Sequence, residues 1–160
     1  AIFLGYSIGS APIISFHYGA KNDNELKNLF KKSISLIGSW GIMLFVIAQL
    51  IAGPLAKLFV GYNADLFLIT KHGFQIFCFA FLINGFNIFG SSFFTALNNG
   101  LISAAISFLR TLVFQLSVVL ILPMILGING IWISVAIAEL LTLCVTVTCL
   151  IRKRKVYHYI

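Results

Sequence analysis

Long apolar segments separated by short polar ones form the main pattern along the chain. Each apolar segment is close to the roughly 20 residues with which a helix crosses a lipid bilayer. The pattern predicts five membrane spans, over residues 1–19, 33–53, 73–95, 101–122 and 131–151. Because a helix satisfies its backbone polar groups within one segment, we expect an all-α fold, a polytopic transmembrane helix bundle.

The distribution of basic residues predicts how this bundle lies in the membrane. Basic residues concentrate between Lys21 and Lys32 and in a tail over residues 152–160. Four predicted spans, an even number, separate the two groups, so both groups must lie on one side. The positive-inside rule places that side in the cytoplasm. We therefore expect a multi-pass protein of the cell membrane whose C-terminal basic tail is cytoplasmic.

Two prolines are expected to end spans, because proline lacks the N–H group that continues a helix. Pro54 follows the second span, and Pro123 follows the fourth. The segment from Leu55 to His72 has fewer positive charges and is partly amphipathic. We expect this segment to lie along the opposite membrane surface before the third span begins.

Composition agrees with a membrane protein and excludes other classes. Hydrophobic residues make up 60% of the chain and charged residues 9%, whereas soluble domains have about half and about a quarter. The net charge of +7 is split between two short clusters, so we expect no nucleic-acid partner. Cys78, Cys144 and Cys149 lie inside spans without the spacing of metal ligands, so we expect no metal site.

The third span carries a narrow polar stripe. On a helix, its polar side chains fall within a sector of roughly 80°; they are Asn84, Asn87, Ser91, Thr95 and Asn98. A carboxamide in hydrocarbon must find a hydrogen-bond partner or cost several kcal/mol. We therefore expect the stripe, and Asn84, Asn87 and Ser91 above all, to face other helices or a water-filled transport pathway.

Two charged residues, Arg110 and Glu139, lie inside predicted spans. Each costs about 2.5 to 3.5 kcal/mol at a helix centre on insertion scales. With a rise of about 1.5 Å per residue, Arg110 lies about 12 to 14 Å from the cytoplasmic end of its helix and Glu139 about 18 Å. A long arginine can bridge that difference. Either the two residues form a structural ion pair, or Arg110 extends alone to the headgroups, or Glu139 takes up a proton or coupling ion under the control of Arg110.

Two residues of the first span are further candidates. His17 is either a polar residue at the membrane interface or part of a proton relay. Tyr6 lies deeper, on a helix rich in small residues, and is a candidate for lining a cavity.

Sequence motifs at both ends of the chain resemble one transporter family. Gly5, Gly9, Pro12 and the run from Ile14 to Asn22 resemble the G-x-x-x-G-x-x-P-x-I-S-x-x-Y-G-A-K-N signature of multidrug and toxic compound extrusion (MATE) transporters. That signature ends the family's eighth helix. Arg110, Pro123 and the stretch Gly127–Trp132 resemble the region before and between its last two helices.

The resemblance implies a twelve-helix protein of two six-helix lobes. Such a protein exports cationic or amphipathic drugs by alternating access, as an antiporter driven by sodium or proton entry, and the coupling ion is its only cofactor. The chain resembles the C-terminal lobe from the eighth helix onward, and it starts at Ala1 without a signal-peptide pattern. We therefore expect a C-terminal piece of a longer protein, whose partner is the missing N-terminal lobe.

One position departs from the family pattern. NorM-like members use an acidic residue of the tenth helix in cation coupling. In this chain, Asn84 resembles that acidic residue in position. Asparagine cannot titrate, so the coupling role shifts to Glu139 or to the N-terminal lobe.

Three other functions are weighed against multidrug efflux. A lipid-linked oligosaccharide flippase of the same superfamily would share the fold, and a passive channel would share the polar stripe. An integral-membrane enzyme would need converging catalytic groups. Since His17, His72 and His158 are not paired with acids at catalytic or metal-ligand spacing, we expect that the protein is not an enzyme.

Overall fold

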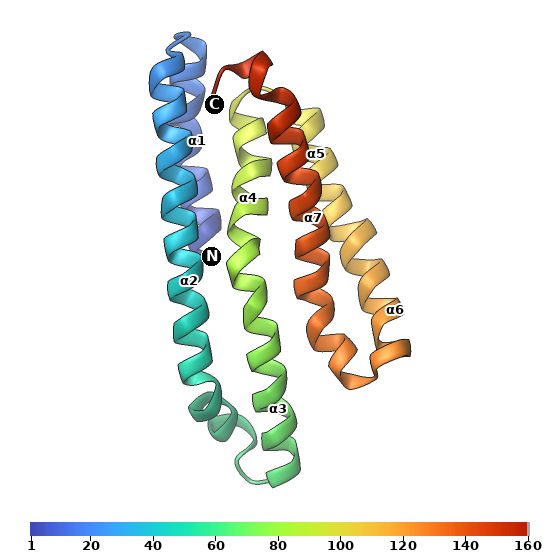
Figure 1. Cartoon of the computed structure of the whole chain (residues 1–160). Coiled ribbons are helices and arrows are strands. Elements are labelled where there is room, and N and C mark those ends of the chain that lie inside the picture. The colour runs from blue at the N-terminus through green and yellow to red at the C-terminus, as the bar shows by residue number, and fades with distance from the viewer. Residues whose placement is uncertain (160) are drawn as a thin grey trace.

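The computed structural model describes residues 1–159, and these fold into helices without a strand. The elements are α1 (Ile2–Gly19), α2 (Asp23–Val60), α3 (Ala64–Phe77), η1 (Cys78–Ala80), α4 (Phe81–Ala96), α5 (Gly100–Phe108), η2 (Leu109–Gln115), α6 (Leu116–Leu126) and α7 (Ile128–Tyr157). The segments α3–η1–α4 and α5–η2–α6 each run on without a loop. The described residues therefore form five rods, which Figure 1 shows side by side.

Four of these rods are long and apolar enough to cross a membrane. They cover Asp23–Val60, Ala64–Ala96, Gly100–Leu126 and Ile128–Tyr157, and each contains an 18-residue stretch whose mean hydropathy lies between 1.8 and 2.2. The fifth rod, α1, has 18 residues, and in Figure 1 its N-terminus lies beside the middle of α2. Large apolar side chains are exposed along these rods, which suits contact with lipid. The prediction of an all-α transmembrane bundle is confirmed.

Asparagine side chains start three of the helices. The Oδ1 atoms of Asn22, Asn63 and Asn99 accept hydrogen bonds from backbone N–H groups in the first turns of α2, α3 and α5. These caps satisfy N–H groups that have no partner inside the helix. The last turn is made by Gly127, whose φ of 59° and ψ of −140° are open to glycine and strained for other residues. Short turns therefore fold the rods back on one another.

Neither Pro54 nor Pro123 ends its helix, so both expectations are wrong. The helix α2 continues past Pro54 to Val60, and α6 continues past Pro123 to Leu126. Figure 1 shows the last turns of α2 at an angle to the rest of the helix. In an apolar setting, a bend that loses one hydrogen bond costs less than unwinding the backbone. The predicted surface segment from Leu55 to His72 is consequently not a separate element, because only residues 61–63 interrupt the helices.

The element α4 is central to the packing. It contacts α1, α2, α5 and α7, and Figure 1 shows it in the middle of the bundle. Its Phe93 is completely buried. The Phe93 ring centroid lies 5.1 Å from that of Phe30 on α2, 5.5 Å from that of Phe89 and 4.9 Å from that of Tyr159. Aromatic contacts thus join the upper ends of several helices.

The helix of the fifth predicted span continues into the segment predicted as a basic tail, residues 152–160. The helix α7 extends through Arg152 to Tyr157, and His158 then turns the chain into the left-handed region with φ of 53°. Tyr159 folds back completely buried, and its hydroxyl donates a hydrogen bond of 2.7 Å to the Leu150 carbonyl. Burial raises the pKa of the Tyr159 hydroxyl, so it remains a donor at neutral pH.

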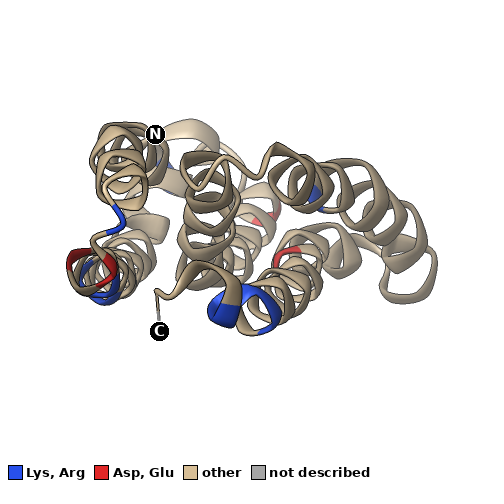
Figure 2. Cartoon of the chain, turned by 90° about the horizontal axis from the view of Figure 1, so that it is seen from above, with Lys and Arg blue, Asp and Glu red and all other residues tan. Residues whose placement is uncertain are grey.

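Both basic clusters lie at the same end of the bundle. Figure 2 views this end from above and shows basic residues at the start of α2 and near the C-terminus. The arrangement agrees with the even number of predicted spans between them. Assignment of this end to the cytoplasm remains a prediction from the positive-inside rule.

Candidate functional site

An ion pair inside the bundle joins η2 to α7. The Arg110 Nη2 atom lies 2.6 Å from Glu139 Oε1, and Arg110 Nε donates to the same oxygen at 3.0 Å. Glu139 is 3% exposed, whereas the Arg110 side chain is 24% exposed. A buried carboxylate needs such a partner because removing an unpaired charge from water costs several kcal/mol. The structure therefore brings together the two charged residues that the sequence placed within the membrane.

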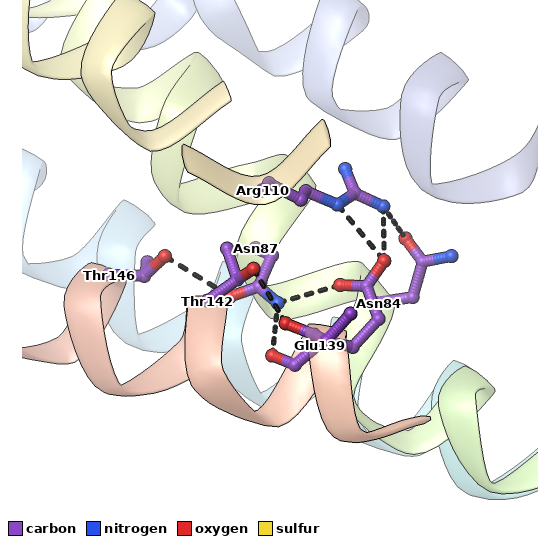
Figure 3. A network of polar contacts seen from close by, with 7 residues as sticks. Asn84, Asn87, Arg110, Glu139, Thr142 and Thr146 are labelled. Atoms are coloured by element: carbon purple, nitrogen blue, oxygen red, sulfur yellow. Dashed lines mark hydrogen bonds and ion pairs between the residues drawn. The ribbon is translucent and has the colours of Figure 1, made fainter. Parts of the chain in front are cut away.

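Two asparagines of α4 complete this arrangement, as Figure 3 shows. Asn84 Oδ1 accepts a hydrogen bond of 2.8 Å from Arg110 Nη2. Asn87 Nδ2 donates to Glu139 Oε2 at 2.7 Å and to the Glu139 backbone carbonyl at 2.8 Å. Asn87 Oδ1 accepts from Thr146 Oγ1 at 3.1 Å. We call Asn84, Asn87, Arg110, Glu139 and Thr146 the charged network.

The close approach of α4 and α7 depends on a glycine. A Cβ atom at Gly90 would overlap the Cγ2 methyl group of Thr146. Gly90 lies one turn after Asn87 on α4, so it allows α7 to come near enough for the bonds from Asn87 to form. Small residues at helix contacts are a common means of such packing in membranes.

Arg110 lies in a π-helical segment, which the sequence pattern does not predict. The element η2 spans Leu109–Gln115 and separates α5 from α6. A π-helical turn is wider than an α-helical turn and occurs often at functional sites. From this segment, the Arg110 side chain reaches Glu139 on α7.

A second cluster, of hydroxyl groups, joins α4 to α5. Ser91 Oγ lies 2.9 Å from Ser103 Oγ and 2.9 Å from Ser107 Oγ. Thr95 Oγ1 donates to Ser103 Oγ at 2.7 Å. This hydroxyl cluster borders a cavity of about 270 Å³ between α1, α4 and the α5–η2 rod. The polar residues that line the cavity are Ser7, Ser91, Ser92, Thr95, Ser107 and Arg110.

The two candidates from the first span, Tyr6 and His17, are not part of the charged network. Tyr6 makes a hydrogen bond of 2.8 Å with Ser33 Oγ, between α1 and α2, and not with the charged network. His17 Nδ1 is buried without a hydrogen-bond partner among residues 1–159. A cavity-lining role for Tyr6 and a relay role for His17 stay predictions. The described residues contain no group of three or more potential metal ligands.

Thr146 and Ser7 are among the polar residues of the site that sequence reasoning missed. Thr146 lies seven residues after Glu139, a spacing that places both side chains on the same face of a helix. The sequence pattern could therefore have identified this threonine. Ser7 had none, because serines are frequent along the first span. Only the packing of α1 against α4 shows that Ser7 lines the cavity.

The fold and site define a class: a polytopic membrane protein that buries charged and amide groups between its helices. Comparison with known proteins gives the family. The MatE family model matches residues 1–121, so the chain belongs to the MatE family of transporters.

A solved structure has a similar fold. The chain resembles the crystal structure of the Vibrio cholerae MATE transporter VcmN in the bent form, with a TM-score of 0.83 and 19% sequence identity. The match covers 97% of this chain and 36% of the Vibrio transporter, so the chain spans about a third of that protein's length. A search of curated proteins finds no match.

Proposed function

We propose that the chain forms part of the C-terminal lobe of a secondary active exporter. The exporter moves cationic or amphipathic compounds out of the cell by alternating access, in exchange for H⁺ or Na⁺. The observation that carries this proposal is the burial of the Glu139 carboxylate between three rods, with one cation and one amide as its side-chain partners.

Glu139 is the acid best placed for ion coupling. The chain has four acidic residues, and the other three, Asp23, Glu25 and Asp65, are exposed at the starts of α2 and α3. A group that exchanges ions across a membrane must be reachable from each side in turn, and a carboxylate within a span meets this need. Asn84 cannot exchange a proton, so it serves as a hydrogen-bond partner of Arg110.

Ion binding at Glu139 requires Arg110 to move. Both Nε and Nη2 of Arg110 contact Glu139 Oε1, so a proton or Na⁺ that binds there competes with the guanidinium. Na⁺ favours oxygen ligands as other hard cations do, and Glu139 Oε1 and Asn84 Oδ1 both bond to the same nitrogen, Arg110 Nη2. Occupancy by the ion would therefore release Arg110 from the pair and change the contacts of η2 with α7. This is the coupling step in the proposed mechanism.

The test uses the full-length transporter in proteoliposomes. A cationic dye is supplied outside, and an imposed H⁺ or Na⁺ gradient provides the driving force. We expect the dye to move against its own gradient only when one ion gradient is present. Movement that merely follows the dye gradient would indicate a passive channel and contradict the proposal. If the gene were instead required for envelope polysaccharide synthesis and the protein did not transport dye, it would be a flippase.

A further inference from the structure

An apolar groove lies between α2 and α7, with α4 behind it. It has a volume of about 350 Å³ and is lined by Phe30 and Ile34 of α2, Phe86 of α4, and Leu143, Val147 and Leu150 of α7. Thr146 also lines the groove, and its hydroxyl group is already bonded to Asn87. The apolar groove therefore offers mainly hydrocarbon and aromatic surface, which suits an apolar chain.

The apolar groove is separate from the polar cavity beside α1. Ser91 and Thr95 of α4 line that cavity, whereas Phe86 of α4 lines the groove. At about 100° per residue, Phe86 projects about 140° from Ser91 and about 180° from Thr95. The two spaces thus lie on different faces of α4, and the proposed exchange of ions does not account for the groove.

Basic residues continue the groove-lining faces of α2 and α7 toward one end of the bundle. On α2, Lys27 falls within about 40° of the middle of the sector that Phe30 and Ile34 define. On α7, Arg154 falls within about 30° of the middle of the sector of the lining residues. Figure 2 shows from above the end of the bundle that holds these basic residues. Each wall of the groove therefore leads to a cation at the same end.

The two cations lie at similar depths in the bundle. Tyr159 connects the walls of the groove, because its ring centroid lies 5.1 Å from that of Phe30 and its hydroxyl group bonds to the Leu150 carbonyl. Lys27 lies three residues beyond Phe30, or about 4.5 Å along α2. Arg154 lies four residues beyond Leu150, or about 6 Å along α7. Two long cationic side chains therefore flank the same end of the groove.

Neither cation is neutralised by an acid of residues 1–159. The ion pair that the structure records within this range is that of Arg110 with Glu139. Asp23 shares the face of Lys27 but lies one turn further from the groove, and it is exposed at the start of α2. Lys27 is half-buried and Arg154 is exposed. Their positive charge is therefore available to an anionic ligand.

We propose that the apolar groove holds an acyl chain of an anionic phospholipid whose phosphate group is bound by Lys27 and Arg154. Basic pockets between transmembrane helices on the cytoplasmic side bind anionic lipid headgroups in other membrane proteins. The positive-inside rule predicts that this end of the bundle is cytoplasmic, and the cytoplasmic leaflet carries anionic lipids. A zwitterionic lipid would fill the groove without supplying net charge to the cations. This inference goes beyond ion-coupled export and does not depend on it.

The first test compares two lipids that have the same acyl chains. The full-length transporter in detergent is titrated with dioleoylphosphatidylglycerol, which is anionic, or dioleoylphosphatidylcholine, which is zwitterionic, and bound lipid is counted by native mass spectrometry. We expect the tightest site to prefer the anionic lipid about 25-fold, which is about fivefold for each of the two cations. Equal affinities for the two lipids would overturn the proposal.

Two double variants locate the headgroup. Lys27→Gln with Arg154→Gln removes both cations and should abolish the preference for phosphatidylglycerol. Lys32→Gln with Arg152→Gln is the matched control, because it removes the same charge from the same helices. These two side chains are exposed and project about 180° and about 170° from the groove, so the control should keep the preference. An equal loss in both double variants would indicate attraction to the overall charge and overturn the site.

A variant that fills the apolar groove tests for the acyl chain. Val147 is 41% exposed, and Leu141, on the opposite face of α7, is 40% exposed. Val147→Trp should weaken phosphatidylglycerol binding at least tenfold, the effect of excluding about two methylene groups, and Leu141→Trp should not. Val147→Phe is the smaller change to use if the tryptophan variant does not fold. If helices outside this chain covered the groove, these variants would lower the yield of folded protein without changing lipid binding, and the proposal would be overturned.

Discussion

Arg110 contacts a single oxygen of Glu139, since its Nε and Nη2 atoms both bond to Oε1 at 3.0 and 2.6 Å. The other carboxylate oxygen, Oε2, is bonded by the neutral amide of Asn87. The carboxylate is thus divided between a charged partner that is partly exposed and a neutral partner that is buried. Movement of Arg110 would remove the compensating charge and leave the hydrogen bond from Asn87 in place.

Exchange of Glu139 for glutamine tests its role in coupling. Glu139→Gln keeps the shape of the side chain and removes its charge, so gradient-driven export should fall by roughly tenfold or more, within the range of measured couplings between sites. Export is measured in proteoliposomes, and membrane insertion should not change. Glu25→Gln is the matched control because Glu25 is exposed at the start of α2. Equal export by Glu139→Gln and the control would remove Glu139 from the mechanism.

Loss of Arg110 alone should destabilise the protein more than loss of both charges. Arg110→Gln leaves Glu139 buried without a cation, which typically costs about 3 to 5 kcal/mol. The double variant Arg110→Gln with Glu139→Gln places two neutral amides in the site and should recover most of that loss. Thermal unfolding of the purified full-length protein measures both variants. A double variant less stable than Arg110→Gln would contradict the compensation of charge inferred from the ion pair.

The two asparagines of the charged network should respond differently to replacement by leucine. Asn87 is 1% exposed and bonds to both Glu139 and Thr146, so Asn87→Leu leaves buried groups unpaired at about 1 to 3 kcal/mol each. Asn84 is only partly buried and bonds to Arg110, which keeps its bonds to Glu139. Asn84→Leu should cost about 1 kcal/mol and mainly change the substrate profile. Equal losses of folded protein in the two variants, measured by size-exclusion chromatography, would be inconsistent with this difference.

A glycine and a threonine methyl group provide a test of helix packing by compensation. Gly90→Ala places a methyl group against Thr146 Cγ2 and should cost about 1 to 3 kcal/mol, as overpacking usually does. Thr146→Ser removes Cγ2 but keeps the hydroxyl group that bonds to Asn87. The combined variant should therefore unfold at nearly the original temperature. Gly100→Ala is the control, because a Cβ atom at Gly100 meets nothing within 4 Å; failure of Thr146→Ser to rescue Gly90→Ala would refute the contact.

Much of the fold could be predicted from hydropathy, and the errors have a common cause. The length of the apolar segments located the rods. The two basic clusters correctly indicated that the start of α2 and the end of α7 lie at the same end of the bundle. Pro54 and Pro123 were expected to stop helices, as they would in water. In lipid, a broken helix has no solvent to satisfy its backbone groups, so the chain bends and continues.

The sequence predicts those site residues whose side chains cost free energy to place within a membrane. Arg110 and Glu139 stand out because a charge within a span requires a partner, and the depth of each on its helix brought the two within reach. Hydroxyl groups do not stand out, because they commonly bond to a carbonyl of their own helix, as Thr142 does to Ala138. Thr146 bonds across to Asn87 instead, and only the packing of α4 against α7 decides this. The π-helical segment η2 likewise has no signal in the apolar pattern.

The return of Tyr159 into the bundle has a practical consequence for labelling. Its ring centroid lies 5.1 Å from that of Phe30 on α2 and 4.9 Å from that of Phe93 on α4, so Tyr159 connects helices that are distant in sequence. A fluorescent reporter or affinity tag inserted next to this tyrosine would disturb these contacts. Attachment beside Tyr62, which is exposed in the turn at residues 61–63, would leave the contacts of Tyr159 undisturbed.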